Sequence, residues 1–432
     1  MADGKLNVFN LGNKGVVLTK APTHNEDGEL SSAQNAILDT DAREGAIRKR
    51  PGLTKVNSSS LAGSVLGAVH VPLPDSGSGG SGGAITRSLW IPRRDNSFTG
   101  NSWLKSTDGT TWAGQTSPTY FQDESNLAGD DLLSIAAVRG KIYFPSYNFT
   151  AGSARPPLNV WDGTTDSIVL TVPTNITAGA ATYERISAGM LSAEGYLYFT
   201  AITDAGATVY SRVFQYNPET GRVLQVGPSL TVGTGGTETQ INDLAWFEGR
   251  LWACTRGDSE GQIFSIRPPS GTFIGDTAWI TEHTATSTLS LYSMASYKGK
   301  LYVGTSVGTV IVRSTTGTFS TSDTASAANS QYSGLFVYQD NLYAAQAKTV
   351  ANTFVYRKFD GTSWTTDFDI KASIGYRDLF VSKPVSFNGS MYGIVDGGTN
   401  LSHVLKNASG TWSSVALTDT VWPSIAILEE GL

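Results

Sequence analysis

The stretch that decides the fold is LAWFEGRLWA, residues 244–253, in which two apolar runs flank the polar pair Glu248 and Gly249. A short polar turn between apolar runs is typical of a β-hairpin. The same pattern recurs in IAAVRGKIYF, SAGMLSAEGYLYF, MASYKGKLYVG, LFVYQDNLYAA and PVSFNGSMYGI. Each second strand carries an aromatic residue near its start: Tyr143, Tyr198, Trp252, Tyr302, Tyr343 and Tyr392, with Trp90 of SLWIP as an earlier, looser member. The sequence therefore predicts seven such hairpins.

A second series of turns follows the first by about 20 residues. Its members are STDGTTW, VWDGTTD, NPETGRVL, PPSGTFI, STTGTFS, FDGTSW and NASGTW, with glycines Gly109, Gly163, Gly221, Gly271, Gly317, Gly361 and Gly410 spaced 44 to 58 residues apart. Glycine suits turns that need a positive φ. Two hairpins per repeat of about 50 residues make a four-stranded meander, which must stack on its neighbours to bury both faces. The predicted fold is an all-β propeller of four-stranded blades.

The two ends of the chain indicate how the ring closes. The carboxyl-terminal segment 421–432 contains WPSIAILEEGL, which matches the first strand of another repeat. Within residues 1–60, GVVLTK matches a second strand, and AQNAILDTD and GAIRKRP, on either side of Gly45, match the third and fourth strands. These segments predict a composite closing blade and favour eight blades in a single domain spanning 1–432. The alternative is seven blades with residues 1–60 as a separate arm. SVLGAVHV is the expected first strand of the first repeat, and the Gly/Ser-rich segment 74–84 is a predicted flexible loop.

Composition excludes several function classes. The net charge is −6 and charged residues make up 16% of the chain, so no polyanion-binding surface covers the whole molecule. No stretch of about 18 apolar residues and no leader pattern occurs, which predicts a soluble protein without membrane insertion. The lone Cys254 lies in an apolar strand, where a structural role is the usual one. The four histidines belong to different repeats, and the sequence predicts no metal site, no cofactor and no catalytic centre.

One motif resembles a feature of a known enzyme fold. Ser106 to Trp112, STDGTTW, is similar to the Asp-box of sialidase-like propellers but one residue short of it. Asp-boxes form turns away from the catalytic centre, so a structural role is expected. A glycosidase needs two carboxylates across a cleft, and no spacing in the chain links such a pair with the arginines near the predicted inner strands. A glycosidase remains the least favoured of three hypotheses.

Two residue groups are candidates for contacts with partners. A basic cluster in the amino-terminal region is a candidate interface or DNA-facing surface, comprising Arg43, Arg48, Lys49, Arg50 and Lys55. Nearby acidic residues largely offset its charge. Tryptophans near the outer hairpins are candidates for recognition of a glycan or receptor, with packing between blades as the alternative: Trp103, Trp112, Trp364 and Trp412.

A family resemblance enters with the amino-terminal region. Residues 28–36, GELSSAQNA, followed by residues 45–53, GAIRKRPGL, resemble the amino-terminal signature of tailed-bacteriophage virion proteins, in which it precedes a repetitive β-rich body. The resemblance covers roughly residues 10–55. It implies a structural component of the virion, made in the host cytoplasm and placed in the tail or neck as a nozzle- or hub-like ring of copies. The implied partners are other tail or neck proteins, with transient contact to packaged DNA.

The leading hypothesis is thus a non-enzymatic virion scaffold. The runner-up is a propeller that binds a host-surface receptor or glycan.

Overall fold

The computed structural model describes seventeen stretches of the chain, which divides into two compact units, Met1–Pro74 and Asp75–Leu432. The described stretches are 36–39, 46–49, 86–92, 103–115, 134–145, 157–171, 183–204, 209–230, 240–256, 261–270, 274–285, 289–324, 330–348, 353–374, 383–395, 402–417 and 425–430.

The amino-terminal unit contains one described hairpin. Strands β1 (Ala36–Asp39) and β2 (Ala46–Lys49) pair antiparallel, with Ala36 opposite Lys49 and Asp39 opposite Ala46, in a two-stranded sheet. The prediction that these segments are adjacent strands around Gly45 is confirmed. The prediction that they join the carboxyl-terminal strand in one blade is corrected, because that strand, β30 (Ala426–Glu430), pairs with β3 (Thr86–Pro92). The predicted strand GVVLTK lies outside the described residues.

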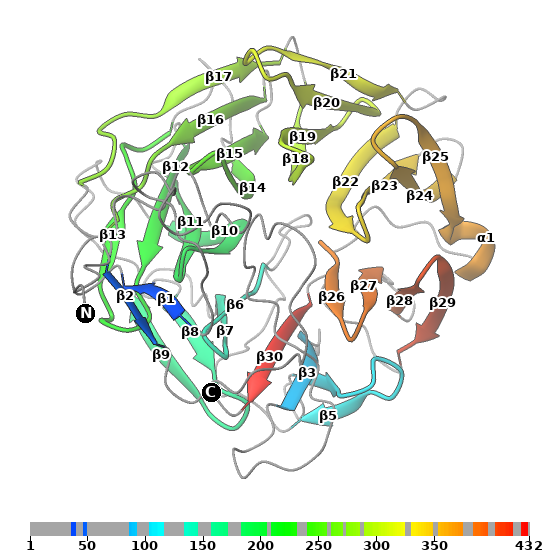
Figure 1. The fold of residues 1–432 in the computed structure, drawn as a ribbon, viewed down its shortest axis with the longest axis horizontal. Helices are drawn as coiled ribbons and strands as arrows, with labels where there is room; N and C mark the ends of the chain where they lie inside the picture. The colour runs from blue at the N-terminus through cyan, green and yellow to red at the C-terminus, as the bar shows by residue number, and fades with distance from the viewer. Residues whose placement is uncertain are drawn as a thin grey trace, which may run out of the picture. The chain divides into compact units, whose positions relative to one another are not determined.

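The second unit is a propeller of seven antiparallel four-stranded sheets (Figure 1). In blades 2 to 7 the strands lie side by side in chain order, which is the predicted meander. Blade 2 comprises β6 (Ala136–Val138), β7 (Lys141–Pro145), β8 (Pro157–Trp161) and β9 (Asp166–Thr171). Blade 3 comprises β10 (Tyr183–Ala193), β11 (Tyr196–Asp204), β12 (Val209–Tyr216) and β13 (Val223–Gln225). Blade 4 comprises β14 (Gln240–Phe247), β15 (Arg250–Arg256), β16 (Gln262–Ile266) and β17 (Ile280–Thr284).

The remaining blades follow the same plan. Blade 5 comprises β18 (Leu291–Tyr297), β19 (Lys300–Thr305), β20 (Thr309–Arg313) and β21 (Phe319–Thr324). Blade 6 comprises β22 (Ser330–Tyr338), β23 (Asn341–Lys348), β24 (Thr353–Phe359) and β25 (Trp364–Asp369), followed by the short helix α1 (Ile370–Ile374). Blade 7 comprises β26 (Val385–Phe387), β27 (Ser390–Val395), β28 (His403–Ala408) and β29 (Thr411–Ala416).

Blade 1 is built from both ends of the unit, in the order β30, β3, β4 (Trp103–Ser106) and β5 (Ala113–Gln115). Trp90 lies opposite Ala426 and Arg87 lies opposite Glu429, while Leu428 is fully buried. The predicted closure by a carboxyl-terminal inner strand within 421–432 is confirmed. The structure has seven blades, the alternative count, and the preference for eight is corrected because β30 supplies the inner strand of blade 1 and does not begin a further blade. SVLGAVHV and the loop 74–84 lie outside the described residues.

The first turn of blades 2 to 7 has the same backbone conformation. Both central residues have positive φ, at Arg139 and Gly140, Glu194 and Gly195, Glu248 and Gly249, Lys298 and Gly299, Gln339 and Asp340, and Asn388 and Gly389. This is the type I′ pattern, whose twist matches that of the strands it joins. The second series also behaves as predicted, with positive φ at six of its seven glycines: Gly109, Gly163, Gly221, Gly317, Gly361 and Gly410. The seventh, Gly271, lies outside the described residues.

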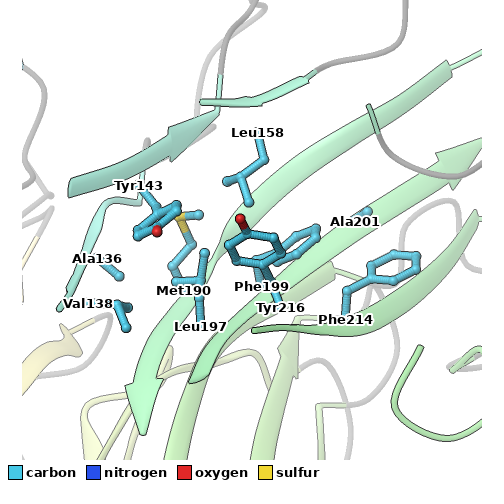
Figure 2. Packing of buried hydrophobic residues seen from close by; sticks show 10 residues of the cluster. All are labelled: Ala136, Val138, Tyr143, Leu158, Met190, Leu197, Phe199, Ala201, Phe214 and Tyr216. Carbon is cyan, nitrogen blue, oxygen red and sulfur yellow. The ribbon is translucent and has the colours of Figure 1, made fainter. Parts of the chain in front are cut away.

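The core consists of apolar clusters between neighbouring blades. Figure 2 shows one, in which Ala136, Val138, Tyr143 and Leu158 of blade 2 meet the side chains from blade 3. The blade 3 members are Met190, Leu197, Phe199, Ala201, Phe214 and Tyr216. Full burial of one such large side chain contributes roughly 1.5–3 kcal/mol. Each blade therefore needs a neighbour on both faces. Strand β30 completes blade 1 and so closes the ring.

The connections alternate between the two ends of the propeller. Turns that join the first to the second strand and the third to the fourth strand lie at one end, which we call the turn end. Connections between the second and third strands, and from one blade to the next, lie at the opposite end. In an antiparallel meander this alternation is required by the strand directions.

Candidate functional site

The tryptophans predicted as recognition residues lie in the apolar clusters. Trp103 is fully buried and makes edge contacts with Trp90 and Phe144, at ring-centroid distances of 6.1 and 5.4 Å. Trp112 is half-buried against the cluster that includes Leu104. These two side chains connect blade 1 to its neighbours, as the packing alternative predicted.

The other two tryptophans are also held in place. Trp364 stacks on Phe359 at 5.1 Å, and its indole N–H donates to Ser322 Oγ at 3.1 Å. Trp412 stacks between Tyr356 and Phe368, each at 4.8 Å.

The indole N–H of Trp412 donates to Asp367 Oδ2 at 2.6 Å. Because both faces of this ring are covered and its N–H is bonded, the side chain stabilises the contact between blades 6 and 7. All four tryptophans thus serve packing in this structure.

The basic cluster is only partly described. Arg48 and Lys49 lie at the end of β2, whereas Arg43, Arg50 and Lys55 lie outside the described residues. The structure does not bring these five residues together into a described surface, and the cluster stays a prediction.

The Asp-box-like motif forms the third turn of blade 1, as expected. Asp108 accepts hydrogen bonds from the backbone N–H groups of Thr111 and Thr110, both at 2.7 Å, and from Ser106 Oγ at 3.0 Å. These bonds hold the pKa of Asp108 well below its usual range, with the Thr111 N–H making the largest contribution. A carboxylate so occupied supports the turn and is poorly suited to acid–base catalysis.

The glycine of this motif has a second role in packing. Gly109 has a φ of +74°, and a Cβ placed on it would lie 2.2 Å from the hydroxyl oxygen of Tyr392 in blade 7. Only glycine fits both the backbone conformation and this close approach. The motif is therefore part of the contact that seals blade 1 against blade 7.

A polar cluster at the inner strands is the principal candidate site. Asp243 lies at a β-bulge of β14, where the register with β15 shifts between Ile241 and Asp243. Its Oδ1 accepts the N–H of Leu244 at 2.9 Å, and its Oδ2 accepts the N–H of Met294 at 2.7 Å. The side chain is 12% exposed. A bulge re-aims a side chain, and here it directs a carboxylate toward the inner strand of blade 5.

A lysine from a distant part of the chain completes the charge balance. Lys383, two residues before β26, places its Nζ 3.1 Å from Oδ2 and 3.3 Å from Oδ1 of Asp243. The same ammonium donates to the carbonyl oxygen of Met294 at 3.1 Å. Its three contacts match the three protons of an ammonium group. The Lys383 side chain is 43% exposed, so the ion pair lies at the boundary between protein and solvent.

A serine extends this cluster into blade 6. Ser293, at a matching bulge of β18, donates to Asp243 Oδ2 at 3.2 Å and accepts the N–H of Leu335 in β22 at 3.0 Å. One hydrogen-bonded chain therefore connects the inner strands of blades 4, 5 and 6 and the residue that leads into blade 7. We call Asp243, Ser293 and Lys383 the axial cluster.

The axial cluster was not predicted, although the repeat holds a signal for it. Counting back five residues from the first residue of each inner turn gives Ser134, Gly189, Asp243, Ser293, Gly334 and Lys383. Four of the six are Ser or Gly, and two are charged with opposite sign. Aligning the repeats on their turns would have singled out this pair.

The chemistry of the axial cluster is that of positioning. Both oxygens of the Asp243 carboxylate accept hydrogen bonds from neighbouring donors, so the group is neither a free base nor a nucleophile. Among the described residues, no three His, Cys, Asp or Glu side chains gather in a manner that suits a metal ion. In the same part of the chain, no helix has the length and apolar character needed to cross a membrane.

No family model matches the sequence, and no curated protein gives a significant match. A candidate 6-phosphogluconolactonase from Bacteroides uniformis has a similar structure, with a TM-score of 0.51, 12% identity, and coverage of 79% of this chain and 99% of that one. A puromycin-hydrolysing peptidase from Mycobacterium tuberculosis also has a TM-score of 0.51 at 12% identity, over 76% of this chain and 51% of the peptidase. TolB from Acinetobacter baumannii has a TM-score of 0.39 at 11% identity, over 79% of this chain and 66% of TolB.

Enzymes are among these similar structures, but at such identities the likeness concerns the fold, since one fold carries many unrelated functions. The strand pairing of the structure establishes that the second unit of this chain is a seven-bladed β-propeller.

Proposed function

We propose that this protein is a structural component of a tailed-bacteriophage virion, in the tail or neck, where it acts as a rigid assembly scaffold. The observation that carries the proposal is the resemblance of residues 28–36 and 45–53 to the amino-terminal signature of such virion proteins. In this proposal the chain is nozzle- or hub-like, and copies of it form a ring that contacts other tail or neck proteins.

The two-unit organisation supports a division of labour. The signature residues belong to the unit Met1–Pro74, whose described part is the β1–β2 hairpin, and the propeller belongs to the other unit. We assign attachment to the amino-terminal unit, with Arg48 and Lys49 at the end of β2 among its contacts. In this role the adjacent charges of Arg48 and Lys49 contact either an acidic surface of a tail protein or a passing DNA backbone.

The propeller unit supports the scaffold part of the proposal. Its ring is sealed by β30, and the four tryptophans considered for recognition pack between side chains of the core. A body whose large aromatic residues stabilise contacts between blades resists deformation, because each blade is held on both faces. Such a body suits a fixed position in an assembly.

The test is whether the full chain is a stoichiometric part of purified particles. Density-gradient-purified virions are analysed by quantitative mass spectrometry and cryo-electron microscopy, and the purified chain is examined by light scattering. We expect a fixed copy number per particle and a ring of copies in solution or in the particle. Particles that lack the chain would contradict the proposal, and so would a monomer that binds host cells.

A matched pair of variants tests the attachment role. Arg48→Glu with Lys49→Glu reverses two charges on β2, while Lys141→Glu with Lys300→Glu reverses two exposed charges on the propeller. We expect both proteins to retain the wild-type melting temperature, and we expect only the first to be lost from particles. Equal incorporation of both variants would remove Arg48 and Lys49 from the proposed contacts.

A further inference from the structure

One position of the repeat differs from blade to blade in a way that the fold alone does not require. The residue five places before each inner turn is small in four of six blades, and it is Asp243 in blade 4 and Lys383 ahead of blade 7. Blades 5 and 6 lie between these two in the order of the ring. The contact between Asp243 and Lys383 therefore joins parts of the propeller that are not neighbours.

The residues at this position in the two intermediate blades are small. Blade 5 has Ser293 at the position and blade 6 has Gly334, which has a φ of +56°. The ammonium of Lys383 lies 3.1 Å from Asp243 Oδ2 and 3.1 Å from the carbonyl oxygen of Met294, the residue that follows Ser293.

We infer that Asp243 and Lys383 form a latch across the inner ring, which holds the segment leading into blade 7 against the inner strands of blades 4 and 5. Asp243 binds blade 5 through Met294 N–H and Ser293, and Lys383 binds both blades at once. While the ion pair is intact, blades 4 and 5 cannot separate at their inner edge without breaking charge-assisted hydrogen bonds. The inference holds whether or not the chain belongs to a virion.

Labelling of a cysteine can report the separation of blades 4 and 5. Cys254 is the single cysteine, is fully buried, and lies directly opposite Asp243 in the β14–β15 register. It packs in the cluster between blades 4 and 5 that includes Met294 and Val303. Burial is the main factor that raises the pKa of the Cys254 thiol well above its ordinary value. A thiol reagent therefore reacts only when this interface opens.

The experiment measures the rate at which a thiol reagent labels Cys254 in the folded full chain. Lys383→Met, Lys383→Gln and Asp243→Asn each break the latch, and the double variant Lys383→Met with Asp243→Asn removes both charges. We expect each single variant to raise the labelling rate about tenfold or more, because local opening governs exchange at buried sites. The double variant should add little, since both residues act through one interaction.

The control variant is Arg250→Met, on the same strand as Cys254. It removes an ion pair of the same blade, between Arg250 and Asp276 at 3.1 Å, whose two side chains are 17% and 21% exposed. We expect its labelling rate to stay within twofold of the wild type. Melting temperatures measured in parallel identify any variant that labels through global unfolding, and Lys383→Gln then provides the milder substitution.

Three results would overturn the latch. The first is labelling of folded Lys383→Gln within twofold of the wild type. The second is an increase in Arg250→Met as large as that in the Lys383 variants. The third is a double variant whose rate equals the product of the two single effects, because that would make the two residues independent.

Discussion

The turn end of the propeller and the axial cluster both rely on aspartates that accept backbone N–H groups, but the partners lie at very different distances along the chain. Asp108 bonds to residues two and three positions away, within one turn. Asp243 bonds to Met294, 51 residues on, and to Lys383, 140 residues on. The first arrangement recurs at Asp162 and Asp360, and the second occurs once among the described blades.

The difference separates what a repeat must have from what one protein has added to it. Each turn must satisfy its own N–H groups, so turn chemistry is copied from blade to blade. The axial cluster draws on three inner strands and a lysine, and no single blade needs it. Features of this second kind are where a specific property of the molecule is to be sought.

The largest expected effect compares two turn glycines that have similar backbone conformations but different surroundings. Gly109→Ala would place a Cβ within 2.2 Å of Tyr392 at a φ of +74°, whereas Gly221→Ala meets nothing within 4 Å at a φ of +69°. Backbone strain alone costs about 1 kcal/mol, and overpacking adds about 2 kcal/mol. We expect urea unfolding to show a loss of about 3 kcal/mol for the first variant and about 1 kcal/mol for the second. Equal losses would mean that Tyr392 moves away freely.

The next effect applies one substitution to both regions. Asp243→Asn replaces one carboxylate oxygen, which accepts a backbone N–H, with an NH2 group, which is itself a donor. The change also leaves Lys383 without its counter-charge. Asp108→Asn changes an exposed turn that water reaches. From the cost of breaking a mostly buried pair we expect a loss of about 2–3 kcal/mol for Asp243→Asn, and about 1 kcal/mol for Asp108→Asn, measured by urea unfolding. The reverse order would show that the axial cluster contributes little to stability.

The same contrast explains how far the sequence predicts the structure. Hairpin turns such as the one at Glu248 and Gly249 were predicted because a local backbone requirement selects local residue types. Closure by 421–432 was predicted because WPSIAILEEGL matches the first strand of another repeat. Its partner was not, because β3 and β30 are far apart in sequence, and the choice between two amino-terminal partners depends on tertiary pairing.

The candidate sites divide in the same way. Tryptophan is a residue type often found at recognition sites, which made Trp412 a candidate. Its stacking partners Tyr356 and Phe368 come from another blade, and no local sequence pattern predicts that contact. Asp243 and Lys383 were overlooked because each alone resembles an ordinary solvated charge. Only their shared position in the repeat connects them.

A smaller effect follows from the turn aspartates and depends on pH. Burial raises the pKa of Asp162, but hydrogen bonds from the N–H groups of Thr165 and Thr164 outweigh it, and the pKa falls to about 2. An unfolded aspartate has a pKa of about 3.9, so the folded state binds the proton more weakly. The carboxylate therefore stabilises the fold above about pH 4, and this contribution is lost as the pH falls toward 2.

Comparison of wild type with Asp162→Asn checks this sign. We expect the difference in unfolding free energy to be largest at neutral pH and to shrink between about pH 4 and pH 2. A difference for Asp162→Asn that is constant with pH would show that its hydrogen bonds do not favour the charged form.

The smallest expected effect has the opposite sign and concerns a polar group that is not satisfied. In contrast to the axial carboxylate, the hydroxyl of Tyr356 is buried without a hydrogen-bond partner among the described residues, although the ring stacks on Trp412. A Cβ on Gly393 would lie 2.8 Å from this hydroxyl oxygen, so the strand β27 passes close to it. Tyr356→Phe keeps the stack and removes the unpaired group, which is expected to be neutral or to stabilise by up to about 1 kcal/mol. A loss of stability in urea unfolding would reveal a partner for the hydroxyl, such as an internal water between blades 6 and 7.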